Sequence, residues 1–444
     1  MFNNLSHLPT IIIGGGPVGL AAAAQLLERG IEPLILEQGN SVGHAIRQWA
    51  HVRMFSPWSY NVDEAARKLL KKHGWKAPCG TGFPTGGELV DKYLEPLAAI
   101  PEIKSRLHFQ QRVTAIARAG IGKVRTQGRE SLPFEVHAIN NEGKVTIFLA
   151  RAVIDSSGTW GQPNPAGANG LFAPGEKENG THITYGMPDV SGTRHTQYKG
   201  KRVAVLGSGH SAIGTLLDLA KLQGEVSSPK ITWLVRKSQL SRVYGGGAKD
   251  KLLERGALGA RLKDLVEAGH IDLEKEFSLS HIDRNENGAL LIHSTDNRVI
   301  SVDELIVATG ARPNLDMLRE IRLGLDSALE CPSVLAPLID PNLHSCGTVR
   351  PHGALQLSHP EQDFYIAGMK SYGRAPTFLL ATGYEQVRSI AAWLAGDIEA
   401  ANRVELNLPE TGVCNTDRSD EPITVKKVEL TQETSKSSCC NVAA

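Results

Sequence analysis

The sequence predicts an α/β fold made of two units, each with a parallel sheet. A short apolar run, a glycine-rich turn and a helical pattern follow one another near the N-terminus, where the turn begins at Gly14. The same order occurs a second time around the turn that begins at Gly207. This order is typical of parallel sheets. The chain of 444 residues also suits two or three domains rather than one. The strand, turn and helix expected in each repeat are residues 11–13, 14–19 and 20–29, then 202–206, 207–209 and 211–223.

Composition narrows the class of protein. Hydrophobic residues make up 41% and charged residues 21%, which is ordinary for a globular chain. The net charge of +1 gives no electrostatic reason to expect nucleic acid or a membrane surface as partner. No window approaches the roughly 18 apolar residues of a membrane span, and the N-terminus lacks the features of a signal peptide. Scattered cysteines favour a reducing cytoplasm as the location.

The first glycine-rich turn matches the pattern G-x-G-x-x-G. Gly14 permits a tight turn, Gly16 has no side chain to block a pyrophosphate, and Gly19 allows close packing of helix and strand. The helix that opens at Pro17 would present free N–H groups to the phosphates. The turn therefore predicts a dinucleotide site, the alternative being a glycine turn of another α/β protein.

An acidic residue supports the dinucleotide site. Glu37 stands 23 residues after Gly14 and ends the next apolar strand, residues 33–36. A carboxylate there can accept hydrogen bonds from ribose hydroxyls. We expect Glu37, and Gln38 beside it, to contact the cofactor.

The second turn carries a base where the first carries an acid. Gly207, Gly209 and Ala212 form a G-x-G-x-x-A pattern, and Arg236 and Lys237 follow the next strand. A cation there suits the 2′-phosphate of NADPH, which an acid would repel. We therefore predict NADPH, the alternative being two ordinary surface charges.

Two runs of small residues are expected to return the chain to these sites. Residues 153–158 follow the first turn, and residues 306–310, ending in Gly310, follow the second. Small residues let the backbone pass close to a ligand. A last apolar strand at 364–367 precedes a long helical pattern at 377–394.

With these motifs the chain resembles the flavoproteins that have two dinucleotide-binding domains, over about residues 8–400. The resemblance implies two Rossmann-like domains, with FAD on the first turn and NADPH on the second, and it makes the FAD domain discontinuous. The expected limits are an FAD-binding domain at 1–190 with a return segment at 316–403, an NAD(P)H-binding domain at 191–315, and a polar tail at 404–444.

Within that group the chain resembles flavin-containing monooxygenases more than disulfide reductases. It lacks the C-x4-C and C-x-x-C pairs of the reductases, since Cys79 has no partner near it. Residues 42–60, 85–94 and 198–203 are similar to segments of the monooxygenases. The Gly207–Ala212 turn, residues 370–378 and the terminal cysteines also resemble flavin-binding monooxygenases of arsenic-resistance gene clusters.

The resemblance implies an NADPH-dependent enzyme that uses oxygen to oxygenate a small soft nucleophile, at sulfur, nitrogen or trivalent arsenic. The alternative is a reductase in which Cys439 and Cys440 capture a metal or metalloid, because soft thiolates match soft acceptors; the tail could equally be silent. A flavin-bearing sensor is a third hypothesis, and a homodimer is left open. Lys370 and Arg374 either face the flavin or form structural ion pairs.

Overall fold

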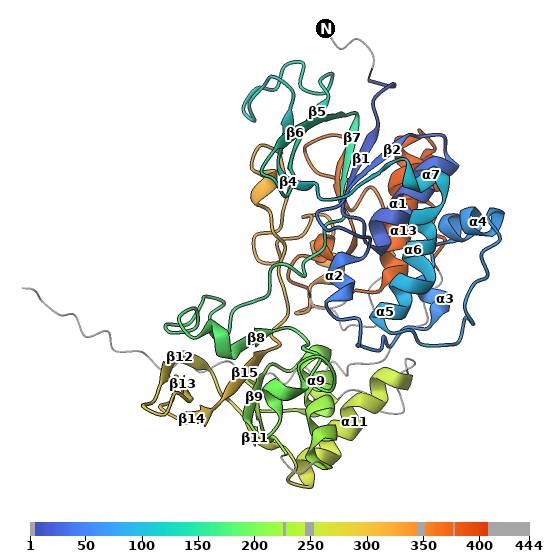
Figure 1. The fold of residues 1–444 in the computed structure, drawn as a ribbon. Coiled ribbons are helices and arrows are strands. Elements are labelled where there is room, and N and C mark those ends of the chain that lie inside the picture. Colours follow the sequence, from blue (N-terminus) through green and yellow to red (C-terminus); the bar gives the residue numbers. More distant parts are fainter. Residues whose placement is uncertain (1–4, 225–227, 245–252, 344–350, 376–377, 407–444) are drawn as a thin grey trace, which may run out of the picture.

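The computed structural model describes residues 5–224, 228–244, 253–343, 351–375 and 378–406. Two five-stranded parallel sheets form the centres of a first and a second unit (Figure 1). The predicted soft-metal residues Cys439 and Cys440 lie outside the described residues. The first sheet has the order β16 (Phe364–Ile366), β7 (Ala152–Asp155), β1 (Thr10–Ile13), β2 (Pro33–Leu36), β3 (Leu107–His108). The second has β8 (Ile183–Tyr185), β15 (Glu304–Val307), β9 (Arg202–Leu206), β10 (Lys230–Leu234), β11 (Asp272–Glu274).

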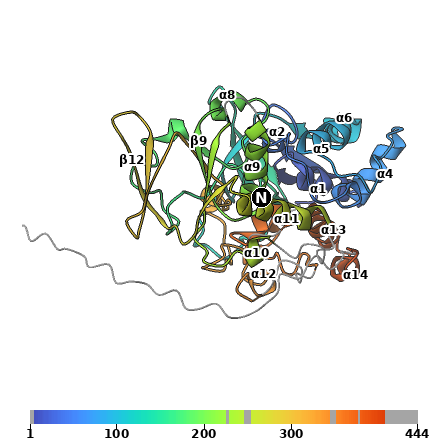
Figure 2. The ribbon, with the colours of Figure 1, turned by 90° about the horizontal axis from the view of Figure 1, so that it is seen from below.

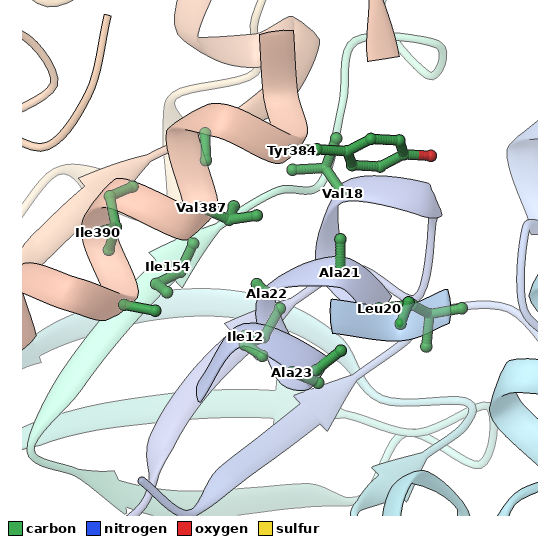
Figure 3. Packing of buried hydrophobic residues seen from close by; sticks show 14 of the residues in the cluster. Ile12, Val18, Leu20, Ala21, Ala22, Ala23, Ile154, Tyr384, Val387 and Ile390 are labelled. Carbon is green, nitrogen blue, oxygen red and sulfur yellow. The ribbon is translucent and has the colours of Figure 1, made fainter. Parts of the chain in front are cut away.

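The first sheet is packed on both faces. Ile12 points toward helices α1 (Pro17–Glu28) and α13 (Leu380–Leu394), where Ala22 and Val387 share its apolar cluster (Figure 3). Ile11 and Ile13 belong to the cluster on the other face, under a small antiparallel sheet. That sheet consists of β4 (Arg112–Arg118), β5 (Phe134–Ile139) and β6 (Val145–Ala150). Burial on both faces explains the continuous apolar run of β1.

The second sheet has the same layering. Helices α9 (His210–Lys221), α10 (Ser241–Tyr244) and α11 (Leu253–Glu267) lie on one face. An antiparallel sheet covers the other, made of β12 (Leu279–Arg284), β13 (Leu290–Ser294) and β14 (Val299–Val302). Figures 1 and 2 place this sheet at the opposite side of the molecule from α4 (Glu64–Lys72).

Short helices complete the fold. They are α2 (His44–Arg47), α3 (Trp58–Asn61), α5 (Gly86–Leu89), α6 (Glu95–Ala99), α7 (Pro101–Lys104), α8 (His195–Tyr198), α12 (Ala336–Ile339) and α14 (Ile398–Asn402), with 3₁₀ turns at Gly180–His182, Leu222–Gly224, Asp316–Leu318 and Gly368–Tyr372. Within the described ranges, no helix combines the length and apolar character that crossing a membrane requires.

Residues 88–99 have an apolar helical period in the sequence, and the structure forms the segment from residue 86 to residue 99 in three pieces. A π-helical turn, Val90–Leu94, separates α5 from α6. Pro96 has no N–H to donate to the carbonyl of Lys92, one turn earlier. The Nε1 of Trp75 donates to that carbonyl instead, at 3.0 Å.

The first unit is discontinuous, as predicted. Strand β16 pairs with β7 at the edge of the first sheet although the whole second sheet lies between them in sequence. Strand β8 pairs with β15 in the second sheet, although it precedes the expected limit at residue 190. We therefore propose that the chain first enters the second unit before β8.

Candidate cofactor-binding sites

The first glycine-rich turn is tight on two sides and open on the third. A Cβ on Gly14, whose φ is +106°, would lie 2.9 Å from the carbonyl oxygen of Ser156. A Cβ on Gly19 would lie 1.9 Å from the carbonyl oxygen of Gly14, so only glycine allows α1 to approach the turn so closely. A Cβ on Gly16 would meet no atom within 4 Å. The space beside Gly16, at the N-terminus of α1, fits a pyrophosphate.

Glu37 is fixed at the edge of this turn. Its buried carboxylate accepts a hydrogen bond from the backbone N–H of Gly15 at 2.6 Å and another from that of Gly39 at 2.7 Å. These bonds hold the carboxylate beside the turn, where ribose hydroxyls of a bound dinucleotide would lie. Gln38 is exposed next to it. The residues present therefore fit the adenosine end of FAD.

Pro17 is the first residue of α1, and its fixed φ suits that position. Gly16 precedes it as the N-cap residue, with extended backbone. Because the first N–H groups of a helix have no partner within it, the end of α1 can bind an anion.

The second turn repeats this geometry with one change. A Cβ on Gly207, whose φ is +138°, would lie 2.3 Å from the carbonyl oxygen of Ala308, and one on Gly209 would meet nothing within 4 Å. Ala212 takes the place of the third glycine, so this turn has room for a Cβ at that position. The Nε1 of Trp233 donates to the carbonyl of Gly207 at 2.7 Å and so helps to fix the turn.

Arg236 and Lys237 lie in the exposed segment after β10. The Nη1 of Arg236 donates to the carbonyl of Ala168 at 2.8 Å, so its guanidinium is anchored while it remains exposed. A guanidinium in this place can bind a phosphate through its other N–H groups. The contact with the 2′-phosphate of NADPH stays a prediction.

The two small-residue runs return to the turns as expected. Ser156 contacts Gly14 and Ala308 contacts Gly207 in the close approaches described above. Gly310, with φ of +90°, accepts from the backbone N–H of Asn164 at 2.9 Å. The Nδ2 of Asn164 also donates to the carbonyl of Thr309 at 3.1 Å. The two connections between the units are thus bonded to each other.

A buried ion pair beside the first turn was not predicted in this form. The Nζ of Lys370 lies 2.6 Å from Oδ2 of Asp155, and both side chains are at most 1% exposed. It also donates to Oγ of Ser157 at 3.1 Å. Arg374 pairs with Glu330 at 2.9 Å. The structural ion pairs that sequence left as an alternative for Lys370 and Arg374 are therefore confirmed.

A buried amide holds the backbone after β16. Oε1 of Gln386 accepts from the N–H of Gly368 at 2.7 Å, and its Nε2 donates to Ser371 Oγ at 2.9 Å. A Cβ on Gly368 would lie 3.3 Å from Val18 of α1. Gln386 thus places the 368–372 turn against the N-terminal end of α1. A single glutamine in a helical pattern does not predict this role from sequence.

Aromatic residues join the segment at 42–60 to the rest of the molecule. The rings of Phe55 and His210 lie 5.4 Å apart, so this segment of the first unit contacts the second glycine-rich turn. Nε1 of Trp160 donates to Oε1 of Gln48 at 2.8 Å. Sequence had singled out this segment by its resemblance to monooxygenases but could not show that it bridges the units.

The described cysteines are free and lie in unlike surroundings. Cys331 is buried, and burial raises the pKa of its thiol to about 12. Cys79 is exposed at a cavity of about 540 Å³, and a hydrogen bond with Thr81 lowers its pKa. These two described cysteines are not bonded to each other, and the described residues contain no disulfide.

The chain belongs to the pyridine nucleotide-disulphide oxidoreductase family, whose model matches residues 11–334. The match confirms the predicted α/β flavoprotein fold and the kind of enzyme, an oxidoreductase that uses FAD and NAD(P)H.

Individual similarities include both monooxygenases and a reductase. Indole-3-pyruvate monooxygenase YUCCA6 of Arabidopsis thaliana is 26% identical over 229 residues, 49% of this chain and 46% of that protein, so the chain spans about half the length of this curated relative. The bacillithiol disulfide reductase Bdr (YpdA) of Bacillus cereus has a TM-score of 0.64 at 20% identity, over 88% of this chain and 99% of that one. DfoA bound to FAD, the cadaverine monooxygenase of desferrioxamine biosynthesis in Erwinia amylovora, has a TM-score of 0.60 at 13% identity, over 91% and 99%. At these identities the structural likeness shows the fold alone.

Proposed function

We propose that this protein is an NADPH-dependent flavin monooxygenase that oxygenates a small soft nucleophile. The observation that carries the proposal is the state of the thiols in the described part of the chain. Cys79 and Cys331 are free, and one of them is buried with a raised pKa. A flavin–disulfide relay needs two thiols that can bond to each other, and the described residues offer no such pair.

The chain's own residues supply binding and orientation. Glu37 would hold the ribose and the N-terminus of α1 the pyrophosphate of FAD, while the second turn and Arg236 would hold NADPH. The FAD held there would supply the redox chemistry, namely hydride acceptance and reaction with oxygen. The Phe55–His210 contact joins the 42–60 segment to the second turn, and in this proposal it would help to shield bound cofactors from water.

The monooxygenase relative supports this choice, and sulfur, nitrogen and trivalent arsenic are the soft centres that we propose as substrates. Trivalent arsenic rests on the sequence resemblance alone. The alternative function is a reductase that uses Cys439 and Cys440 to present a metalloid or disulfide to the flavin. These cysteines lie outside the described residues, so a chemical test must separate the two functions.

The test is turnover under ¹⁸O₂ with an organic sulfide, a tertiary amine and arsenite as separate probes. We expect NADPH consumption and one ¹⁸O atom in at least one product. A variant carrying Cys439→Ser and Cys440→Ser should retain that labelled product. The reductase is probed separately, without oxygen, with a disulfide and with arsenate as electron acceptors. NADPH consumption that depends on one of these acceptors and is lost in the double variant, with no ¹⁸O product from the other probes, would instead establish the reductase.

A further inference from the structure

Two histidines and an aspartate meet on the outer face of the small sheet in the second unit. His281 on β12 stands directly opposite His293 on β13, and Asp283 lies two residues along β12 from His281. Alternate residues of a strand share a face, so all three side chains project from the same side. Ile282 and Ile292 point the other way and are buried in the core.

The candidate ligand atoms are already close together. Oδ2 of Asp283 lies 3.5 Å from Nε2 of His281 and 3.3 Å from Nε2 of His293. One ligand atom from each of the three residues lies within 4.8 Å of the others. Zn–N and Zn–O bonds of about 2.0–2.2 Å require separations of roughly 3–4 Å, so small side-chain rotations suffice.

A contact with a neighbouring serine favours one tautomer of His281. The Oγ of Ser280 donates to the carbonyl oxygen of His293 at 3.1 Å. The same Oγ lies 3.0 Å from Nδ1 of His281, and while Ser280 donates to the carbonyl it can accept from that imidazole nitrogen. Nε2 of His281 then carries the lone pair, on the side that faces Asp283. Fixing a ligating histidine through its other nitrogen is the usual arrangement at metal sites.

His293 provides a second nitrogen that lacks a good hydrogen bond. Its Nε2 is buried and makes no hydrogen bond in the structure, although Asp283 is near. The two imidazole rings are stacked, with centroids 4.0 Å apart and planes at 12°. A cation between the rings and the carboxylate would satisfy all three groups.

We propose that His281, Asp283 and His293 bind one divalent transition-metal ion of the Zn²⁺, Co²⁺ and Ni²⁺ class. Two imidazoles and one carboxylate are the donors that such ions prefer, whereas Mg²⁺ and Ca²⁺ prefer oxygen ligands alone. The ion ties β12 to β13 and thereby stabilises the second unit by binding its folded form.

The site lies on the small sheet and not on the glycine-rich turns. The ion is therefore independent of the flavin function proposed above.

The test is calorimetric titration of the untagged full chain with Zn²⁺. Cys439→Ser and Cys440→Ser are introduced first, so that the terminal thiols do not compete. We expect one ion per chain, and His281→Gln and His293→Gln should each weaken binding at least about tenfold. His137→Gln is the matched control, because His137 also lies beside a carboxylate, that of Glu135, on a small antiparallel sheet. It should leave binding unchanged.

Co²⁺ absorption gives a second readout that does not depend on affinity. We expect visible bands of a nitrogen and oxygen ligand set, without the charge-transfer band of a thiolate, and their loss in Asp283→Asn. A thiolate band, equal weakening by His137→Gln, or no binding by a chain with wild-type circular dichroism would each overturn the proposal.

Discussion

The two parallel sheets are built to the same plan and differ at the positions where a ligand would be distinguished. Ile13 pairs with Asp155 in the first sheet as Leu206 pairs with Val307 in the second. The N–H of Gly14 donates to the carbonyl of Leu36 at 2.9 Å, and that of Gly207 to the carbonyl of Leu234 at 3.1 Å. Shared backbone bonds therefore form both turns, whatever side chains surround them.

The differences concern packing and charge. Gly19 in the first unit corresponds to Ala212 in the second, so only the second turn has room for a Cβ at that position. Glu37 follows β2 directly, whereas the base Arg236 stands one place further along after β10. Asp155, paired with Lys370, occupies the place of Val307. The same backbone frame thus lies beside an acid and a buried ion pair in one unit and beside exposed basic residues in the other.

Removal of the buried cation should have the largest effect. Lys370→Met leaves the Asp155 carboxylate buried without its partner, which costs about 3–5 kcal/mol. We expect a large fall in the unfolding midpoint in urea and loss of FAD from the purified protein. Adding Asp155→Asn removes the orphaned charge and should restore part of the stability. An unchanged midpoint for Lys370→Met would show that the pair does not hold this strand end.

Exchange of the third turn residue tests the difference in packing. Gly19→Ala places a methyl group against the carbonyl of Gly14, and we expect a cost of up to about 3 kcal/mol with reduced FAD content. The converse change, Ala212→Gly, should cost only about 1 kcal/mol, because glycine weakens a helix. Thermal unfolding and flavin absorbance measure both. Equal effects of the two substitutions would contradict the difference in packing.

Acid should weaken the first unit through His359. Burial lowers the pKa of this imidazole to about 4, so the fold holds it neutral. The unfolded chain binds a proton at this histidine below its unfolded pKa of about 6.5, whereas the folded chain does so only near pH 4. The free energy of unfolding is therefore unaffected by His359 well above pH 6.5 and falls as the pH drops toward 4, by about 2 kcal/mol at pH 5. His359→Gln can still accept from the N–H of Gly324, and it should flatten the fall in unfolding free energy between pH 7 and pH 5. An unaltered pH dependence would exclude His359 as the cause.

The smallest effect should be selective for one coenzyme. Arg236→Ala removes an exposed cation, and we expect KM for NADPH to rise about tenfold while KM for NADH stays unchanged. Arg261→Ala, an exposed arginine on α11 of the same unit, serves as control. Equal losses with both coenzymes would refute the assignment of the 2′-phosphate to Arg236.

Short-range sequence patterns made the strands, turns and helices of the two dinucleotide-binding units predictable. The apolar runs, the glycines and the helical pattern after each turn depend on neighbours a few residues apart, and they located β1, α1, β9 and α9. The positive φ values of Gly14 and Gly207 are what the tight turns require. The acid and the base after the second strands followed from the same spacing.

Contacts across long stretches of sequence were not predictable. Asp155 and Lys370 are 215 residues apart, and neither residue indicates the other. The cross-strand meeting of His281 and His293 depends on the register of a hairpin with a bulge between Leu279 and His281. A shift of one residue would turn one histidine to the other face, so only the folded chain reveals the pair.

The most direct test of the proposed monooxygenase is rapid mixing. The protein is reduced with NADPH in the absence of oxygen and then mixed with oxygenated buffer while the flavin spectrum is followed. We predict a transient spectrum, distinct from both reduced and oxidised flavin, that decays faster when the soft nucleophile is present. Direct, slow reoxidation without a transient would contradict the monooxygenase and point to the reductase.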